Sequence, residues 1–245
     1  PGHGPDYLTR PTAARAARRF TVGERRPTGG GQAVRCLVLA PGPDWVAVDL
    51  RTGALLRAPV SELGPTSPAG EGQFRLGATL TAVELVLADS DLPPDASRPE
   101  AVHLAEAPLP LPSPRRRNVR HLVGHLVTKS PERPLLGTLG PSVAYSDLDG
   151  GRPSVVVVQP DKRARFGIGT GGPWCEFTLG GRRHAVSYVG EPLWTDAHRP
   201  GHDKGARSAL KAGAAATMSK YLVVGFGPPR RGQLPKVVLG ALPAI

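Results

Sequence analysis

The chain has 245 residues and a net charge of +11, and this charge is unevenly distributed: +5 over residues 1–36, −6 over 37–114 and +12 over 115–245. No apolar run approaches the roughly 20 residues that a membrane-spanning helix needs. Two cysteines, Cys36 and Cys175, are too few for a small disulfide-rich secreted scaffold. These features predict a cytoplasmic protein with no membrane span, although a single Cys36–Cys175 bridge stays possible from sequence alone.

Glycine and proline together predict short strands and many turns, because the chain contains 31 Gly and 28 Pro. The expected fold class is mainly β with one α-helix, arranged as two small barrel-like modules joined by a Pro-rich linker. The first 128 residues contain no Lys, and all their cations are Arg. Together with the abundance of Ala, Gly and Pro, this bias is typical of a GC-rich bacterial genome.

Residues 1–32 are expected to form a basic, flexible arm, closed by Gly29, Gly30 and Gly31. Residues 33–106 follow as a small acidic β module. A Gly-containing loop at 51–53 predicts a hairpin, and several short strands in this length suggest an SH3-like or oligonucleotide/oligosaccharide-binding (OB) barrel. The expected strands cover residues 33–40, 45–50, 54–59, 74–87 and 101–105.

Residues 107–117 (APLPLPSPRRR) are predicted to be a linker, because alternating proline favours an extended polyproline II conformation. Residues 118–245 are then a basic β-rich module. Residues 203–220 are its only expected helix, with Asp203 as the N-cap. The strands expected here cover residues 119–127, 143–145, 154–159, 165–168, 174–179, 184–189, 221–226 and 236–239.

Gly180 and Gly181 predict a two-residue hairpin turn, and this turn fixes a strand register. In that register Cys175 and His184 lie on one face as diagonal neighbours, which makes them candidate catalytic residues, nucleophile and base. The competing interpretation is structural, because Cys175 also belongs to an apolar stripe. Residues 167–172 (GIGTGG) match GxGxxG, but a strand-like segment follows them, so a plain glycine turn is expected.

Two HxxxH spacings are candidates for metal binding. His198 and His202 lie in a polar loop beside Asp196 and Asp203, and two imidazoles with a carboxylate can hold zinc. The alternative for this loop is a surface turn leading into a capped helix. The other pair, residues 121 and 125, falls in an expected strand, where its side chains would be too far apart to chelate one metal.

Basic residues form four clusters that are candidate polyanion-binding sites. Turns also collect solvated charge in most proteins, which is the alternative explanation. The cluster members are Arg115, Arg116, Arg117, Arg120, Lys162, Arg163, Arg165, Arg182, Arg183, Arg230 and Arg231.

The charge pattern favours a non-enzymatic protein that binds nucleic acid, either duplex DNA or structured RNA, through phosphate contacts. One alternative is an assembly scaffold with acidic protein partners or copies of itself. A second is a hydrolase that uses the His198/His202 loop or the Cys175/His184 pair. No cofactor is expected.

Overall fold

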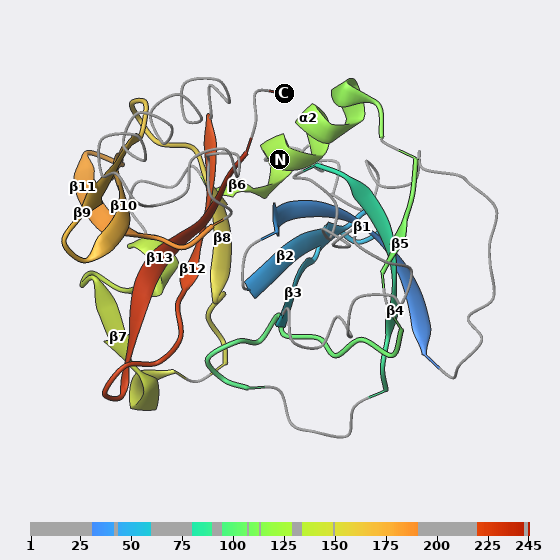
Figure 1. The fold of residues 1–245 in the computed structure, drawn as a ribbon, viewed down its shortest axis with the longest axis horizontal. Helices are drawn as coiled ribbons and strands as arrows, with labels where there is room; N and C mark the ends of the chain where they lie inside the picture. Colours follow the sequence, from blue (N-terminus) through green and yellow to red (C-terminus); the bar gives the residue numbers. More distant parts are fainter. Residues whose placement is uncertain are drawn as a thin grey trace, which may run out of the picture.

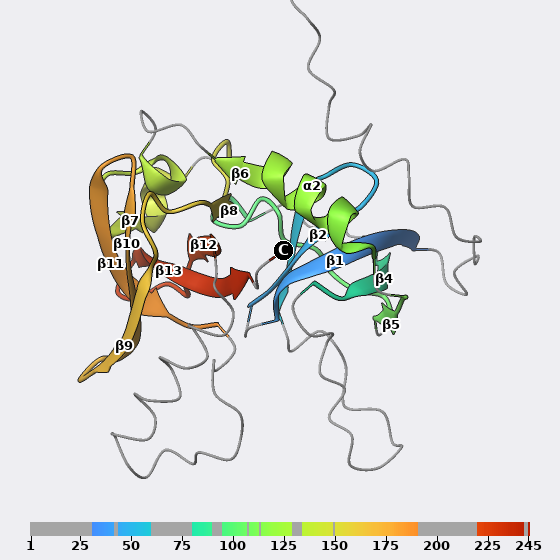
Figure 2. The same cartoon turned by 90° about the horizontal axis from the view of Figure 1, so that it is seen from above.

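The structure, a computed structural model, describes residues 31–41, 44–59, 80–89, 95–106, 108–112, 114–128, 134–148, 150–190, 220–242 and 245. Over these ranges the fold is mainly β, as the sequence predicts, and its one α-helix is not the helix expected at 203–220. Figures 1 and 2 show two sheets side by side, with the helix α2 (Arg116–Leu126) lying across their junction. The predicted arm at 1–32 lies almost wholly outside these ranges, and the helix at 203–220 is described only at its last residue.

The first sheet is built from the acidic part of the chain, in the order β3-β2-β1-β4-β5. Its pairings are antiparallel, and the predicted hairpin at 51–53 is confirmed. The Asp49 carboxylate holds that turn by accepting from the N–H of Arg51 at 2.7 Å and the hydroxyl of Thr52 at 2.6 Å. The strands are β1 (Gln32–Pro41), β2 (Asp44–Asp49), β3 (Leu55–Pro59), β4 (Ala82–Leu87) and β5 (Leu109–Pro110).

The second sheet has the order β6-β8-β12-β13-β11-β10-β9, and a further strand, β7, pairs with β13. It is mixed, because β6 runs parallel to β8 and β11 runs parallel to β13. The strands are β6 (Val127–Thr128), β7 (Ser142–Ala144), β8 (Val155–Val158), β9 (Arg165–Gly169), β10 (Gly172–Leu179), β11 (Arg182–Tyr188), β12 (Tyr221–Phe226) and β13 (Gln233–Leu242).

The strand expected at residues 119–127 is wrong, since this segment forms most of α2. Val119, Leu122 and Val123 are buried on one side of the helix, and Leu126 is partly buried against the same cluster. This spacing of three, one and three residues follows the period of a helix rather than that of a strand. The β-branched valines suggested a strand, but the apolar spacing and tertiary packing override that propensity.

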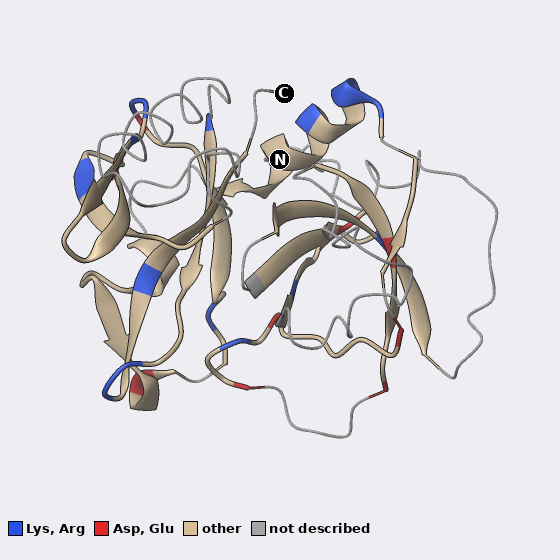
Figure 3. Ribbon diagram, viewed as in Figure 1, with Lys and Arg blue, Asp and Glu red and all other residues tan. Residues whose placement is uncertain are grey.

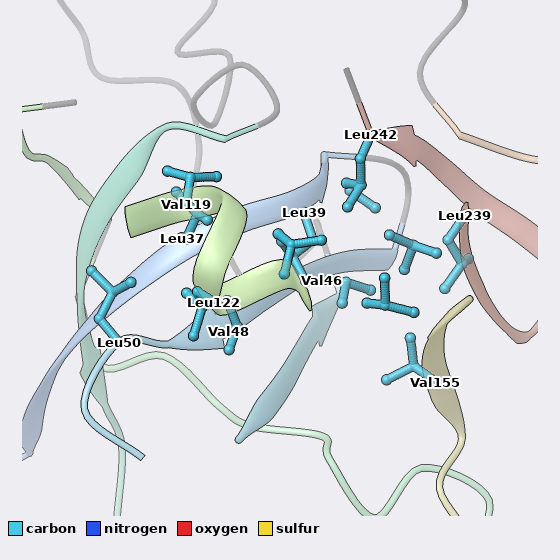
Figure 4. Close-up of a cluster of buried hydrophobic side chains, with 14 of the residues drawn as sticks. Leu37, Leu39, Val46, Val48, Leu50, Val119, Leu122, Val155, Leu239 and Leu242 are labelled. Carbon is cyan, nitrogen blue, oxygen red and sulfur yellow. The ribbon is translucent and has the colours of Figure 1, made fainter. Parts of the chain in front are cut away.

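A shared apolar cluster joins the two sheets through α2 (Figure 4). Leu37 and Val48 come from the first sheet, Leu122 from the helix, and Val155 and Leu239 from the second sheet. Close backbone approach tightens this junction, because a Cβ placed on Gly240 of β13 would lie 2.9 Å from the Cβ of Ala40 in β1. The Pro-rich segment therefore does not hold the sheets apart.

A buried arginine also crosses the junction. The Nη2 of Arg57, on β3, donates to the carbonyl oxygen of Phe226 at 2.5 Å, and its Nη1 lies 3.4 Å from the hydroxyl of Ser154. That hydroxyl donates to the Glu100 carboxylate at 2.5 Å. A cation buried in this way needs polar partners, and these bonds supply them from the opposite sheet.

Neither described sheet closes into a barrel, because no ladder joins β3 to β5 or β6 to β9. The SH3-like and OB-like barrels expected from sequence are therefore without support in the strand order. The segment expected as a linker contains β5, and its last two residues, Arg116 and Arg117, begin α2. Cys36 and Cys175 are free and buried in different clusters, so they form no bridge.

Candidate functional site

The hairpin of β10 and β11 has the register expected from the Gly180-Gly181 turn. Cys175 pairs with Val186, Phe177 with His184, and Leu179 with Arg182. Gly180 and Gly181 have φ values of 57° and 76°, a left-handed conformation that glycine adopts without steric cost. The two glycines thus determine which side chains share each face of the sheet.

The loop before β9 is bonded to this hairpin turn. The Asp161 carboxylate accepts from the N–H of Gly180 at 3.2 Å and from the N–H of Gly181 at 2.8 Å. The Asp161 N–H donates in turn to the carbonyl oxygen of Thr178 at 2.8 Å. These bonds bring together two clusters that lie about twenty residues apart in sequence.

We call the combined surface the basic tip, and all its basic side chains are exposed. Sequence analysis found both clusters but could not place them together, because the link is one carboxylate in a loop. The five members are Lys162, Arg163, Arg165, Arg182 and Arg183.

Glu176 of β10 lies between two arginines of the basic tip. Its carboxylate forms an ion pair with Arg183 on one neighbouring strand and lies 3.9 Å from Arg165 on the other. The arginine side chains remain 77% exposed at Arg165 and 73% at Arg183. Since a guanidinium has five N–H donors, one shared carboxylate leaves donors available to another anion.

Trp174 is a residue of this surface that sequence reasoning missed. It alternates with Glu176 on β10 and pairs with Gly167 of β9, two residues from Arg165. Its ring lies so close to Gly167 that a Cβ there would come within 2.3 Å of it. The sequence signal was strand alternation, which places Trp174, Glu176 and Arg165 on one face.

The remaining basic candidates lie elsewhere. Figure 3 shows separate basic regions at α2, at β9–β11 and at the turn between β12 and β13. Arg115 to Arg117 surround the start of α2, and Arg120 donates from its Nε to the carbonyl oxygen of Ile245 at 3.0 Å. Arg230 and Arg231 are exposed in the β12–β13 turn. The structure therefore does not bring these clusters to the basic tip.

Cys175 and His184 occupy the expected face, but their surroundings favour a structural role. Cys175 is fully buried, and burial raises the pKa of its thiol to about 12, which leaves almost no thiolate at neutral pH. The His184 ring stacks on Phe177 with 5.1 Å between centroids. Burial lowers the pKa of His184, and the charges of Lys236 and Arg182 lower it further.

The loop with Asp196, His198, His202 and Asp203 lies outside the described residues. Within the described ranges, no group of three or more His, Cys, Asp or Glu side chains could hold a metal ion. The GIGTGG segment ends β9 with residues 167–169, turns at 170 and 171, as expected for a glycine turn, and begins β10 at Gly172.

In the part of the chain that the structure describes, no helix has the length and apolar character needed to cross a bilayer. Comparison with protein-family models, with curated proteins and with solved structures gave no significant match.

Proposed function

We propose that this chain is a non-enzymatic nucleic-acid-binding protein of the cytoplasm whose basic tip contacts the phosphate backbone. The observation that carries the proposal is the junction of two basic clusters by Asp161, which brings five exposed cations to the turn end of the β10–β11 hairpin. Arginine and lysine on such surfaces contact phosphate oxygens and release the counterions around them.

The neighbouring residues suit this role. Glu176 orients Arg165 and Arg183 in advance without neutralising both, so less conformational freedom is lost when a phosphate arrives. Trp174 adds an aromatic ring on the same face, and such rings can stack on an exposed base or sugar. The acidic part of the chain forms the other sheet, whose charge repels the phosphate backbone and directs it to the basic side.

The test compares two triple variants that remove the same charge. One is Lys162→Gln/Arg165→Gln/Arg182→Gln, which retains Arg183 as the partner of Glu176. Its matched control is Arg115→Gln/Arg116→Gln/Arg117→Gln on α2. Binding of the full chain to short duplex DNA and to a folded RNA hairpin is measured by fluorescence anisotropy across a salt series, with heparin as competitor.

The slope of log K against log salt is negative. We expect its magnitude to decrease by roughly 2 to 3 for the basic-tip variant and by much less for the α2 control. The ratio of DNA to RNA affinity identifies which nucleic acid is preferred. Equal losses of affinity in both variants, or heparin binding as tight as nucleic acid, would mean that the net positive charge attracts any polyanion without a defined site. The proposal would then fail.

A further inference from the structure

The exposed side of α2 carries two histidines one helical turn apart, His121 and His125. Their Nε2 atoms lie 3.3 Å apart, and the ring centroids are 4.4 Å apart with 74° between the ring planes. The strand expected from sequence would have kept these rings separate, so their meeting is a direct consequence of the helix. Both are exposed, because the buried face of α2 belongs to Val119, Leu122 and Val123.

The separation of the two nitrogens fits a metal ion between them. Imidazole nitrogens bind zinc at about 2.0–2.1 Å, and two such ligands at a tetrahedral angle lie roughly 3.3 Å apart. Two histidines at i and i+4 on a helix present their rings on one side, as zinc-binding helices require. Gly124, beside His125, leaves space, since a Cβ there would meet no atom within 4 Å.

We propose that His121 and His125 form a binding site for a divalent transition-metal ion, with water filling the other coordination positions. No third metal-binding side chain joins them within the described residues. Two neutral imidazoles favour Cu²⁺ over Zn²⁺ and exclude Mg²⁺ and Ca²⁺, which prefer oxygen ligands. This site is independent of the nucleic-acid proposal, because it lies on a different element from the basic tip.

Metal binding through both Nε2 atoms sets the tautomers of the two rings. Without metal, the two Nε2 atoms face each other at 3.3 Å, and which ring donates depends on the tautomers of the two imidazoles. When both Nε2 lone pairs bind a metal, the donating ring must carry its proton on Nδ1 instead, and solvent can move it there because the rings are exposed.

The test uses the full chain with any affinity tag removed, titrated with CuSO₄ and with ZnCl₂ by isothermal calorimetry. The variants are His121→Gln, His125→Gln and the loop double variant His198→Gln/His202→Gln. We expect one ion per chain, tighter binding of Cu²⁺, and at least a roughly tenfold loss of affinity in each α2 variant. The loop variant should bind like the wild type.

A second measurement separates metal binding from folding. The α2 histidines are exposed, so both α2 variants should keep the wild-type Tm without metal. When metal is added, the wild type and the loop variant should gain Tm and the two α2 variants should not. Wild-type affinity in the α2 variants, loss of binding only in the loop variant, or no binding to the wild type would each overturn the proposal.

Discussion

The basic tip and the start of α2 carry similar arginines on different supports. At the tip, Asp161 bonds the loop to the hairpin turn, and Glu176 pairs with arginines on both neighbouring strands. At α2, Arg115 is the N-cap residue without a side-chain capping bond, and no acidic residue occupies the first turn. Positive charge at a helix N-terminus opposes the helix dipole.

This difference shows that the two regions are stabilised in different ways. Carboxylates arrange the tip locally, so its cations are oriented before a ligand binds. The helix receives no such help at its N-terminus and depends on its apolar face, which packs between the two sheets (Figure 4). Changes to the core should therefore affect α2 most, and changes to its first residues should affect it least.

The largest effect is expected for Leu122→Ala, which removes a buried side chain at the centre of the α2 packing. The free energy of unfolding should fall by about 2–5 kcal/mol, the usual range for deleting a buried leucine side chain. Urea unfolding measures this change. The matched control is Leu139→Ala, whose side chain is 73% exposed and should matter by less than about 0.5 kcal/mol.

The same experiment tests whether the sheets act as one body. Because Leu122 belongs to a cluster formed by residues of both sheets, unfolding should remain a single transition at a lower urea concentration. Two separate transitions, one for each sheet, would contradict the shared core.

An intermediate effect is expected from Lys236, a buried cation on β13. Its Nζ donates to the carbonyl oxygen of Thr138 at 2.5 Å, and burial lowers the pKa of Lys236 to about 8. Between pH 8 and about 10.5 the unfolded chain keeps a proton that the folded chain has released. The unfolded state then binds more protons, so this group makes stability rise with pH across that window.

Lys236→Met should remove this rise, whereas Lys220→Met, which changes an exposed lysine, should retain it. The measurement is the free energy of unfolding by urea at pH 7.5, 8.5 and 9.5, compared as differences from the wild type. Parallel curves for the wild type and Lys236→Met would show that Lys236 does not titrate in this range.

Sequence predicted the strands well where turn chemistry was explicit. The Gly180-Gly181 turn gave the β10–β11 register pair by pair, and the loop at 51–53 gave the β2–β3 hairpin. Alternation within a strand could also have placed Trp174 beside Arg165. Local signals of this kind depend on residues that are close in sequence.

Sequence failed where a long-range contact decided the outcome. Residues 119–126 carry helical spacing, but their valines favour a strand, and only packing between two sheets resolves the conflict. The link from Asp161 to Gly181 spans twenty residues and depends on one carboxylate, so no local pattern announces it. The contact between His121 and His125 was missed because the sequence predicted a strand, and not a helix, for the segment that contains them.

The smallest effect is expected at the N-cap of α2, where Arg115→Ser is compared with Arg115→Ala. Both variants remove one positive charge from the positive end of the helix dipole, so that benefit is common to them. Of the two side chains, only serine can accept a hydrogen bond from a backbone N–H of the first turn, which makes Arg115→Ser about 1 kcal/mol more stable than Arg115→Ala. Urea unfolding of the two proteins measures this difference. Equal stability would mean that the N–H groups at the start of α2 gain nothing from a capping side chain. The start of α2 would then differ from the basic tip only in its uncompensated positive charge.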